Sequence, residues 1–189
     1  GHGEIVQQLL AHSAIDVNSQ DEEGETALFA AVRAGNEVAF WKLTAHSGIN
    51  PHLRNKKGET ILMTAIVAKQ QSAEILQWLL DQCDVNLQDN EGETALFAAV
   101  RAGNEVAFWK LTAQSGINPH LRNKKGETVF MTAIVTKRQS TEVLQWLLDQ
   151  CDVNLQDNEG ETALFFAART GNERIVQQLL AYDTIDVNL

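Results

Sequence analysis

The sequence predicts an all-α solenoid, in which stacked helix-turn-helix units carry short β-hairpin or turn fingers. The tripeptide Gly-Glu-Thr recurs every 34 residues, beginning at Gly24, Gly58, Gly92, Gly126 and Gly160. Each interval holds two short helix-forming runs, neither of which is long enough to bury a hydrophobic core alone. Neighbouring units must therefore stack and share one core.

In the first kind of unit, local residue types mark the helix boundaries. Thr26 stands at the N-cap position of a run of strong helix formers, and Gly35 provides the left-handed turn that ends this run. Asn36 is the expected cap of the second helix. An extended stretch follows, and an Asn-Lys-Lys-Gly turn closes it. The expected order is helix, helix and finger, over residues 27–34, 37–45 and 49–58.

A second kind of unit alternates with the first and differs between its two helices. Lys69 replaces the glycine, and the connection gains residues before Ser72, which is the expected cap of a helix over residues 73–81. The loop after that helix is one residue shorter, so the unit keeps its common length. We expect a longer first helix or a looser turn between the helices in these units.

The repeats predict one continuous array over residues 1–189. Residues 24–91 and 92–159 differ at only seven aligned positions, so a pair of units is duplicated. Residues 1–10 match residues 171–180, which predicts that the sequence opens halfway through a unit of a longer array. The expected division is a partial unit, 1–23, four full units, 24–57, 58–91, 92–125 and 126–159, and a nearly complete last unit, 160–189.

Residue types at fixed places in each unit agree with a known repeat. The last unit carries Gly-Glu-Thr-Ala-Leu at 160–164, Ile-Val at 175–176 and Leu-Leu at 179–180. Asp-Val-Asn occurs at residues 16–18, 84–86, 152–154 and 186–188. In these features the chain resembles the ankyrin repeat family along essentially its whole length. Phe or Met replaces the histidine of the family's consensus, and apolar packing is expected to substitute there for a Thr–His hydrogen bond, at Phe29, Met63, Phe97, Met131 and Phe165.

The resemblance implies protein binding through a concave face, made of the finger tips and the exposed sides of the first helices. The tips alternate between acidic and basic residues, and a partner with charges at matching intervals gains orientation and association rate. The alternative is that neighbouring tips neutralise one another, because exposed ion pairs contribute about 0–1 kcal/mol. The partner-binding hypothesis names Glu22, Glu23, Arg33, Lys56, Lys57, Asn90, Glu91, Arg101, Lys124, Lys125, Asn158, Glu159 and Arg169.

Four tryptophans form a second candidate surface on the second helices. Stacked helices lie about 8–10 Å apart, so the indoles are expected to form a continuous ridge on the outer side of the array. The simpler interpretation is packing of these amphipathic rings between units. The sharper one is a secondary patch for weak self-association or a second partner. The residues are Trp41, Trp78, Trp109 and Trp146.

Composition and motifs argue against other functions. The net charge of −10 disfavours nucleic-acid and membrane partners, because their phosphates attract Lys and Arg. The sequence shows no nucleophile motif, phosphate-binding glycine loop or metal-ligand cluster, so no catalytic residue, metal or cofactor is predicted. Cys83 and Cys151 are expected about 20 Å apart, too far for a disulfide. We expect both to be half-buried loop residues in a reducing compartment such as the cytoplasm.

Three functions are compatible with such an array. The first is a module that binds a protein partner, whose identity the sequence does not give. The second is a passive spacer or assembly segment of a larger protein, which the nearly identical copies favour. The third is the targeting domain of a host-directed effector, acting in the host cytosol, with its activity in another segment. The resemblance also implies a narrower modification, hydroxylation of Asn18 or Asn188, which follow Leu10 and Leu180 at the required distance.

Overall fold

The computed structural model describes residues 2–12, 14–68, 72–182 and 184–188, and this part of the chain forms eleven α-helices. Isolated β-bridges join Arg54 to Thr60 and Arg122 to Thr128 within two of the fingers. The helices are α1 (His2–Leu10), α2 (Ala27–Arg33), α3 (Glu37–Thr44), α4 (Ile61–Ala68), α5 (Ala73–Gln82), α6 (Ala95–Ala102), α7 (Glu105–Thr112), α8 (Val129–Thr136), α9 (Thr141–Gln150), α10 (Ala163–Arg169) and α11 (Glu173–Leu180).

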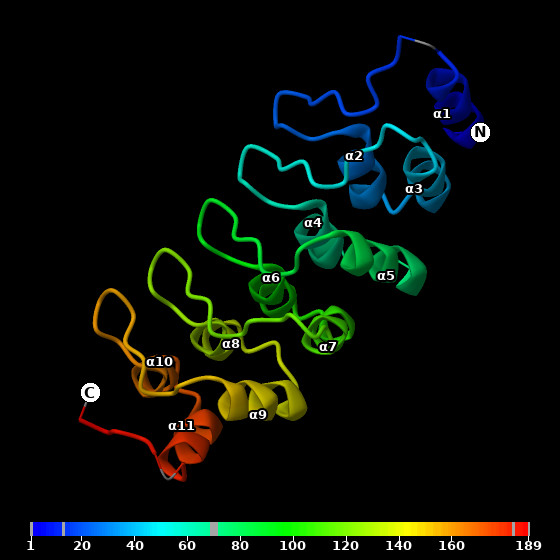
Figure 1. Ribbon diagram of the computed structural model, residues 1–189. Coiled ribbons are helices and arrows are strands. Elements are labelled where there is room, and N and C mark those ends of the chain that lie inside the picture. The colour runs from blue at the N-terminus through cyan, green and yellow to red at the C-terminus, as the bar shows by residue number, and fades with distance from the viewer. Residues whose placement is uncertain (1, 13, 69–71, 183, 189) are drawn as a thin grey trace.

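The helices form two layers that run the length of the array (Figure 1). One layer holds the first helices of the units, from α2 to α10, and each of them packs against the next first helix along the chain. The other layer holds the second helices, α1, α3, α5, α7, α9 and α11. The fingers project from the side of the molecule opposite to this second layer. The all-α solenoid expected from the 34-residue period is confirmed. The division into one continuous domain stays a prediction.

The caps of the second helices follow the sequence closely. The Asn36 side chain accepts a hydrogen bond of 3.0 Å from the backbone N–H of Ala39. Helix α3 begins at Glu37, the residue after this cap. Gly35 has a φ of 62°, the left-handed conformation that ends the preceding helix. Thr26 occupies the N-cap position of α2, but its side chain makes no capping hydrogen bond there.

The looser turn is the alternative that holds in the second kind of unit. Helix α8 has eight residues, as α6 has, so in this pair of units the first helix is not longer. The connection from α8 to α9 takes four residues, 137–140, and begins at Lys137 with a φ of 52°. Ser140 caps α9, which has ten residues against eight in α7. The matching Lys69-Gln70-Gln71 connection lies outside the described residues.

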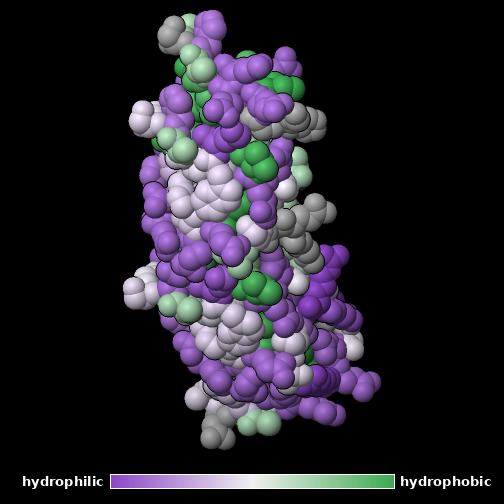
Figure 2. All heavy atoms as spheres, turned by 90° about the vertical axis from the view of Figure 1, so that its right-hand side faces the viewer, coloured by the Kyte–Doolittle hydropathy of each residue, from purple (hydrophilic) through white to green (hydrophobic). Residues whose placement is uncertain are grey.

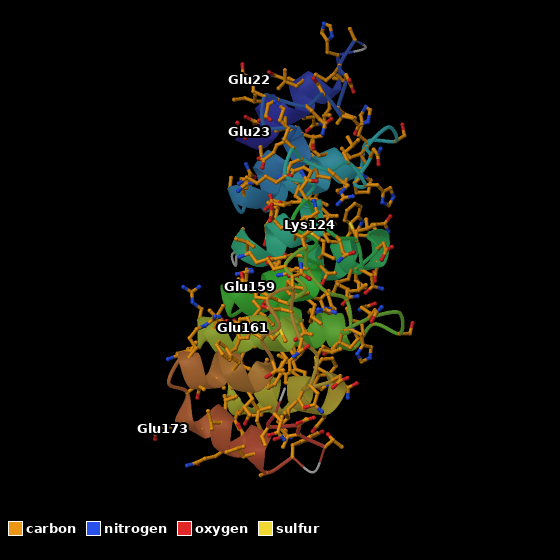
Figure 3. The ribbon with its side chains drawn as sticks, turned by 90° about the vertical axis from the view of Figure 1, so that its left-hand side faces the viewer. Glu22, Glu23, Lys124, Glu159, Glu161 and Glu173 are labelled. Carbon is orange, nitrogen blue, oxygen red and sulfur yellow. The ribbon has the colours of Figure 1, made fainter. Side chains whose placement is uncertain are left out.

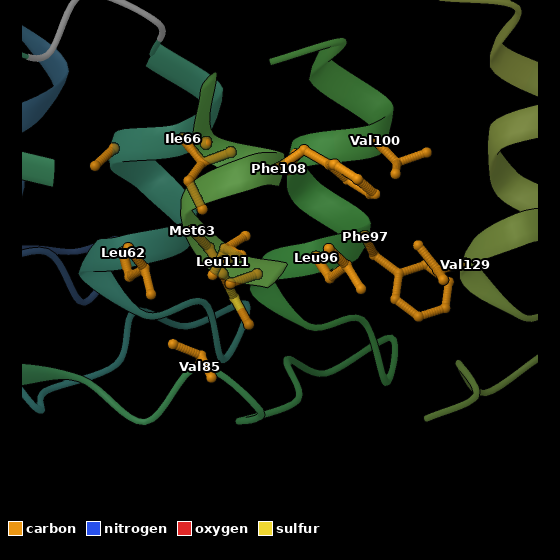
Figure 4. Packing of buried hydrophobic residues seen from close by; sticks show 14 of the residues in the cluster. Leu62, Met63, Ile66, Val85, Leu96, Phe97, Val100, Phe108, Leu111 and Val129 are labelled. Atoms are coloured by element: carbon orange, nitrogen blue, oxygen red, sulfur yellow. The ribbon is translucent and has the colours of Figure 1, made fainter. Parts of the chain in front are cut away.

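The core is a continuous apolar layer between the stacked units. Phe97 of α6 is 1% exposed and points toward α8, with Val129 beside it (Figure 4). Packing in place of the consensus histidine is confirmed at Phe29, Phe97, Met63 and Met131, which are all buried. The expectation is wrong at Phe165, which is 49% exposed because no described unit stacks on α10 from that side.

The two cysteines are more buried than the sequence suggested. Both are free thiols at the C-cap positions of α5 and α9. The expectation of half-buried loop residues is therefore corrected, since Cys83 and Cys151 are 9% and 8% exposed. Burial raises the pKa of the Cys83 thiol to about 11 and that of Cys151 to about 12.

Candidate protein-binding face

Each finger is held in shape by one side-chain oxygen at its tip. Asp21 accepts hydrogen bonds of 2.9 Å and 2.8 Å from the backbone N–H groups of Glu23 and Glu25. Asn55 accepts from the N–H groups of Lys57 and Glu59 in the same way, both at 3.0 Å. Asp and Asn are interchangeable for this purpose, because both carry an acceptor oxygen on Cγ that reaches the backbone N–H two residues on. The alternation of tip residues therefore leaves the backbone of the fingers unchanged.

Backbone hydrogen bonds join each finger to the next. The N–H of Lys56 donates to the carbonyl of Glu23 at 2.9 Å, and the N–H of Lys124 donates to that of Glu91 at 2.7 Å. The finger in between follows the same rule, in which the later finger donates to the earlier one: the backbone N–H of Asn90 donates to the carbonyl of Lys57 at 2.9 Å. The Asn90 side-chain amide adds a bond of 2.8 Å to the carbonyl of Lys56. The tips thus form a fixed row whose charged side chains are exposed.

Glutamine and arginine alternate at the base of this row. Gln20 donates to the carbonyls of Gly24 at 2.6 Å and Arg54 at 2.9 Å. Arg54 in turn donates to the carbonyls of Gly58, at 2.7 Å, and Gln88. Gln88 repeats the pattern toward Arg122. Sequence reasoning missed these residues, although their position four residues before each finger glycine is regular.

The three arginines named in the partner-binding hypothesis are already paired within the chain. Arg33 binds both carboxylate oxygens of Glu25, with its Nε 2.9 Å from Oε2. The pairs Arg101–Glu93 and Arg169–Glu161 repeat this contact. The hydrogen bond from Arg33 lowers the pKa of Glu25, and the carboxylate raises the pKa of Arg33. The arginine side chains remain about half exposed, at 46–51%, so each offers a partly neutralised guanidinium edge.

The ten finger-tip residues of the hypothesis are all exposed. Figure 3 looks onto this side and places Glu22, Lys124 and Glu159 at successive levels of the array. Three ion pairs between arginine and glutamate lie in the described part of the chain, and none of them joins two tips. Neutralisation of neighbouring tips by direct ion pairing is thus not observed in this part of the chain.

Two hollows lie between the finger tips and the first helices. One, of about 370 Å³, has Lys57 and Glu59 on the finger side and Arg33, Met63 and Val67 on the helix side. The other, of about 410 Å³, lies two finger intervals further on and includes Lys125, Glu159, Phe166 and Arg169. Both combine exposed charges with an apolar floor, which is the composition of a protein-binding surface.

Comparison with known families decides the identity of the repeat. A family model described as ankyrin repeats, in three copies, matches residues 38–123 and 107–189. The chain belongs to the ankyrin repeat family. Ankyrin repeats are generally protein–protein interaction modules and are typically not enzymes. A comparison with curated proteins gives no match.

The tryptophans of this ankyrin array form two clusters rather than one ridge. The buried Phe40 ring contacts Trp41 at 5.0 Å and Trp78 at 5.4 Å between ring centroids, both edge to face. Phe108 makes the same contacts with Trp109 and Trp146. The expectation of one continuous tryptophan ridge is therefore wrong. On this side of the molecule the hydrophobic areas are separate spots among hydrophilic residues (Figure 2).

Exposure also differs within each tryptophan cluster. Trp41 and Trp109 are 39% and 40% exposed, whereas Trp78 and Trp146 are half-buried and pack against the core. Packing between units is thus the role of the second pair, because each reaches a phenylalanine of the preceding unit. A self-association patch remains a prediction only for the exposed pair.

The Asp-Val-Asn asparagines connect successive ankyrin units. Asn18 donates to the carbonyl of Gly48 at 2.7 Å and accepts from the N–H of Asn50 at 2.8 Å. Asn86 and Asn154 make equivalent bonds to the following units. Asn188 is exposed. Hydroxylation of Asn18 or Asn188 stays a prediction.

The described residues contain no group of three or more His, Cys, Asp or Glu side chains placed to hold a metal ion. Within the same residues, no helix has the length and apolar character needed to cross a membrane.

Proposed function

We propose that this chain is a recognition module that binds a folded protein partner across the finger tips and first helices. The observation that carries the proposal is the row of fingers, in which every interior tip is fixed by hydrogen bonds to the next while its charged side chains stay exposed. A surface that is ordered before binding loses little conformational entropy on binding.

Charge spacing supports a partner with a complementary pattern. The exposed pair Lys56 and Lys57 lies between the acidic tips that contain Glu23 and Glu91, and Lys124 and Lys125 repeat the basic step. Because no ion pair joins neighbouring tips in the described residues, a partner does not have to break one first. Complementary charge then contributes to orientation and association rate.

The direct test is capture of the partner from lysate of the source or host cell. A chain with Lys56, Lys57, Lys124 and Lys125 all changed to Glu is expected to lose a protein that the native chain retains. Loss follows because charge reversal places like charges against the partner, which costs several kcal/mol across an interface.

A matched pair of double variants separates surface from net charge. The Lys57→Glu/Lys125→Glu chain and the Lys42→Glu/Lys110→Glu chain change the net charge equally, and both pairs lie at equivalent places in the duplicated units. Lys42 and Lys110 lie on α3 and α7, away from the fingers. Equal capture by both chains contradicts the proposal. Absence of any saturable partner favours the spacer function, or an effector whose activity lies in another segment.

A further inference from the structure

The finger tips alternate in charge at every step of the array. The first, third and fifth tips, at residues 21–23, 89–91 and 157–159, carry carboxylates, and the second and fourth, at residues 55–57 and 123–125, each carry two lysines. The glutamates and lysines of these tips are exposed, and none of the three ion pairs found in the described residues joins two tips. The tip charges are therefore available to a surface that carries the opposite order of charges.

A second copy of this chain carries such a surface. When two arrays face each other in opposite directions about a twofold axis, the tips meet in pairs. An axis between the second and third fingers pairs the first finger with the fourth and the second with the third, so all four contacts join opposite charges. An axis through a finger instead pairs every tip with one of its own sign, which disfavours that arrangement.

We propose that two copies of this chain form an antiparallel dimer through their finger tips, with first fingers facing fourth fingers and second fingers facing third. The inference rests on the proposed function, because it names a second copy as a partner of the finger face. The twofold arrangement is closed, since both copies use the same surface. Parallel arrays that face each other at the same level put like charges together, and a shift of one unit leaves tips without a partner.

The first finger favours this register over the other complementary one. An axis between the third and fourth fingers also joins opposite charges, but it pairs the second finger with the fifth. The tip at residues 21–23 presents three exposed carboxylates, whereas in the fifth tip Glu159 is exposed and Asp157 is half-buried. More negative charge therefore faces a lysine pair when the first finger takes part, opposite Lys124 and Lys125.

The tips are ordered before two copies meet. Asp21 and Asn55 hold the backbones of their fingers, and the N–H groups of Lys56 and Lys124 bind the preceding fingers. Because the tips stand at successive levels of the array (Figure 3), one orientation of the second copy aligns all four contacts. The net charge of −10 opposes association, but at about 0.15 M salt charges are screened beyond about 8 Å, so the contacting tips dominate.

Sedimentation equilibrium of the native chain tests the dimer. The paired tips contribute fewer residues than the roughly 20–30 a side of a stable interface, so a weak dimer is expected, with a dissociation constant between about 10 μM and 1 mM. The Lys42→Glu/Lys110→Glu chain changes the net charge on α3 and α7, away from the fingers, and is expected to keep this constant. A native chain that is monomeric at about 1 mM overturns the inference.

Two complementary variants separate contacts between tips from net charge. The acidic variant changes Lys56, Lys57, Lys124 and Lys125 to Glu, and the basic variant changes Glu22, Glu23 and Glu91 to Lys. Each alone is expected to dimerise at least about tenfold more weakly than the native chain, because like charges then meet. An equimolar mixture is expected to recover association as a one-to-one complex.

Net charge does not explain such recovery. The two variants have net charges of −18 and −4, so they repel each other at long range and attract only where their tips meet. None of the seven side chains makes a hydrogen bond or ion pair among the described contacts, so both variants are expected to keep the native far-UV circular dichroism. A mixture that stays monomeric overturns the inference.

Carbodiimide cross-linking identifies the register. Glu22 and Lys124 lie three finger intervals apart in one chain, or about 24–30 Å. A zero-length amide bond between these fingers therefore forms only between two copies. Peptide mass analysis of the cross-linked native dimer is expected to find Glu22 or Glu23 joined to Lys124 or Lys125. A dimer without this link overturns the inference.

Capture from lysate keeps this inference apart from the proposed function. If the native chain is monomeric but retains another protein that the acidic variant loses, the finger face binds that protein and the dimer is wrong. If the dimer forms with the expected cross-link but the acidic variant captures every protein that the native chain captures, the tips serve self-association alone. The inference then stands, and recognition of a different protein through the tips fails.

Discussion

Asn55 donates a side-chain hydrogen bond of 2.6 Å to Glu59, and this pair replaces the Arg33–Glu25 ion pair of the alternate units. Where the tip residue is Asp21, it has no amide to donate, and the glutamate of the finger is held by an arginine eight residues further on. Where the tip residue is Asn55, the arginine position holds Val67, which is 58% exposed. The two kinds of unit therefore satisfy the same half-buried carboxylate in two ways.

Replacing Asn55 with Asp is expected to destabilise the array by about 1.5–3 kcal/mol, the usual contribution of a hydrogen bond to a charged group. The new carboxylate keeps the acceptor bonds to the backbone but faces Glu59 without a donor. Adding Val67→Arg is expected to recover at least half of the loss. The unfolding midpoint in urea, followed by circular dichroism, measures both changes.

The control for this exchange is Asp21→Asn. An amide at that position adds a donor to Glu25, and Glu25 keeps its ion pair with Arg33. The free energy of unfolding is therefore expected to change by less than about 0.5 kcal/mol. If Val67→Arg fails to restore the Asn55→Asp chain, the two arrangements are not equivalent.

The Arg33–Glu25 pair predicts loss of stability in acid. Because Arg33 holds the pKa of Glu25 below its usual value of 4.5, the carboxylate contributes stability above that value and loses it as the pH falls through the folded pKa. The melting temperature of Arg33→Gln is expected to lie below that of the native chain at pH 7, and the gap is expected to narrow below about pH 4.5.

Val67→Gln provides the comparison for that experiment, because it changes the equivalent position where no ion pair exists. Its melting temperature is expected to follow the native chain at every pH. A gap for Arg33→Gln that stays constant from pH 7 to pH 3.5 rules out the ionic contribution of this pair.

The fold was predictable because its determinants are local and repeat. Asn36 and Gly35 act through hydrogen bonds and backbone angles within one unit, so a single unit is enough to place them. The looser connection at Lys137 was one of two alternatives, and only packing against α6 selects it, where Gln139 donates to the carbonyl of Val100 at 2.6 Å.

Contacts between side chains were harder to predict from the sequence than the helix caps. The pairing of Arg33 with Glu25 depends on how the finger folds back over its own first helix, which the spacing of eight residues does not reveal. The separation of the tryptophans into two clusters depends on their contacts with Phe40 and Phe108, which the spacing of the tryptophans does not reveal. Ile5 and Phe165 are exposed because no unit of the described chain stacks beside them, which a residue's own sequence context does not show.

The raised thiol pKa values predict slow alkylation of the folded chain. With a pKa of about 11, Cys83 is a thiolate in about one molecule in a thousand at pH 8, and Cys151 in fewer. Intact-mass analysis after iodoacetamide treatment at pH 8 is expected to show no adduct in the folded chain. In guanidinium chloride two adducts are expected, one for each cysteine. Rapid modification of the folded chain contradicts the burial of these groups.

The two tryptophans around Phe40 are expected to differ in their effect on stability. Trp78→Ala removes a half-buried ring that packs across two units, at an expected cost of about 2 kcal/mol or more. Trp41→Ala removes a ring that is 39% exposed and contacts a neighbour on its own helix, so the cost is expected to be at most about half as large. Urea unfolding of both variants measures the difference, and equal costs contradict the packing role assigned to Trp78.

Gly92 and Gly160 offer a matched test of the contact between fingers. Both have a left-handed backbone, with φ of 79° and 82°, so alanine costs about 1 kcal/mol of backbone strain at either position. A Cβ at Gly92 lies 2.8 Å from the backbone nitrogen of Lys124, whereas a Cβ at Gly160 has no atom within 4 Å. Gly92→Ala is therefore expected to cost about 1–3 kcal/mol more than Gly160→Ala in urea unfolding.

Hydrogen exchange locates that extra cost. The N–H of Lys124 donates to the carbonyl of Glu91 at 2.7 Å, and a methyl group at residue 92 pushes these fingers apart. Exchange at Lys124 is expected to accelerate in Gly92→Ala and to stay at the native rate in Gly160→Ala, because the second change touches no neighbouring finger. Equal stability of the two variants, with equal exchange at Lys124, means that the fingers are not held together by this contact and that the binding face is less ordered than its hydrogen bonds indicate.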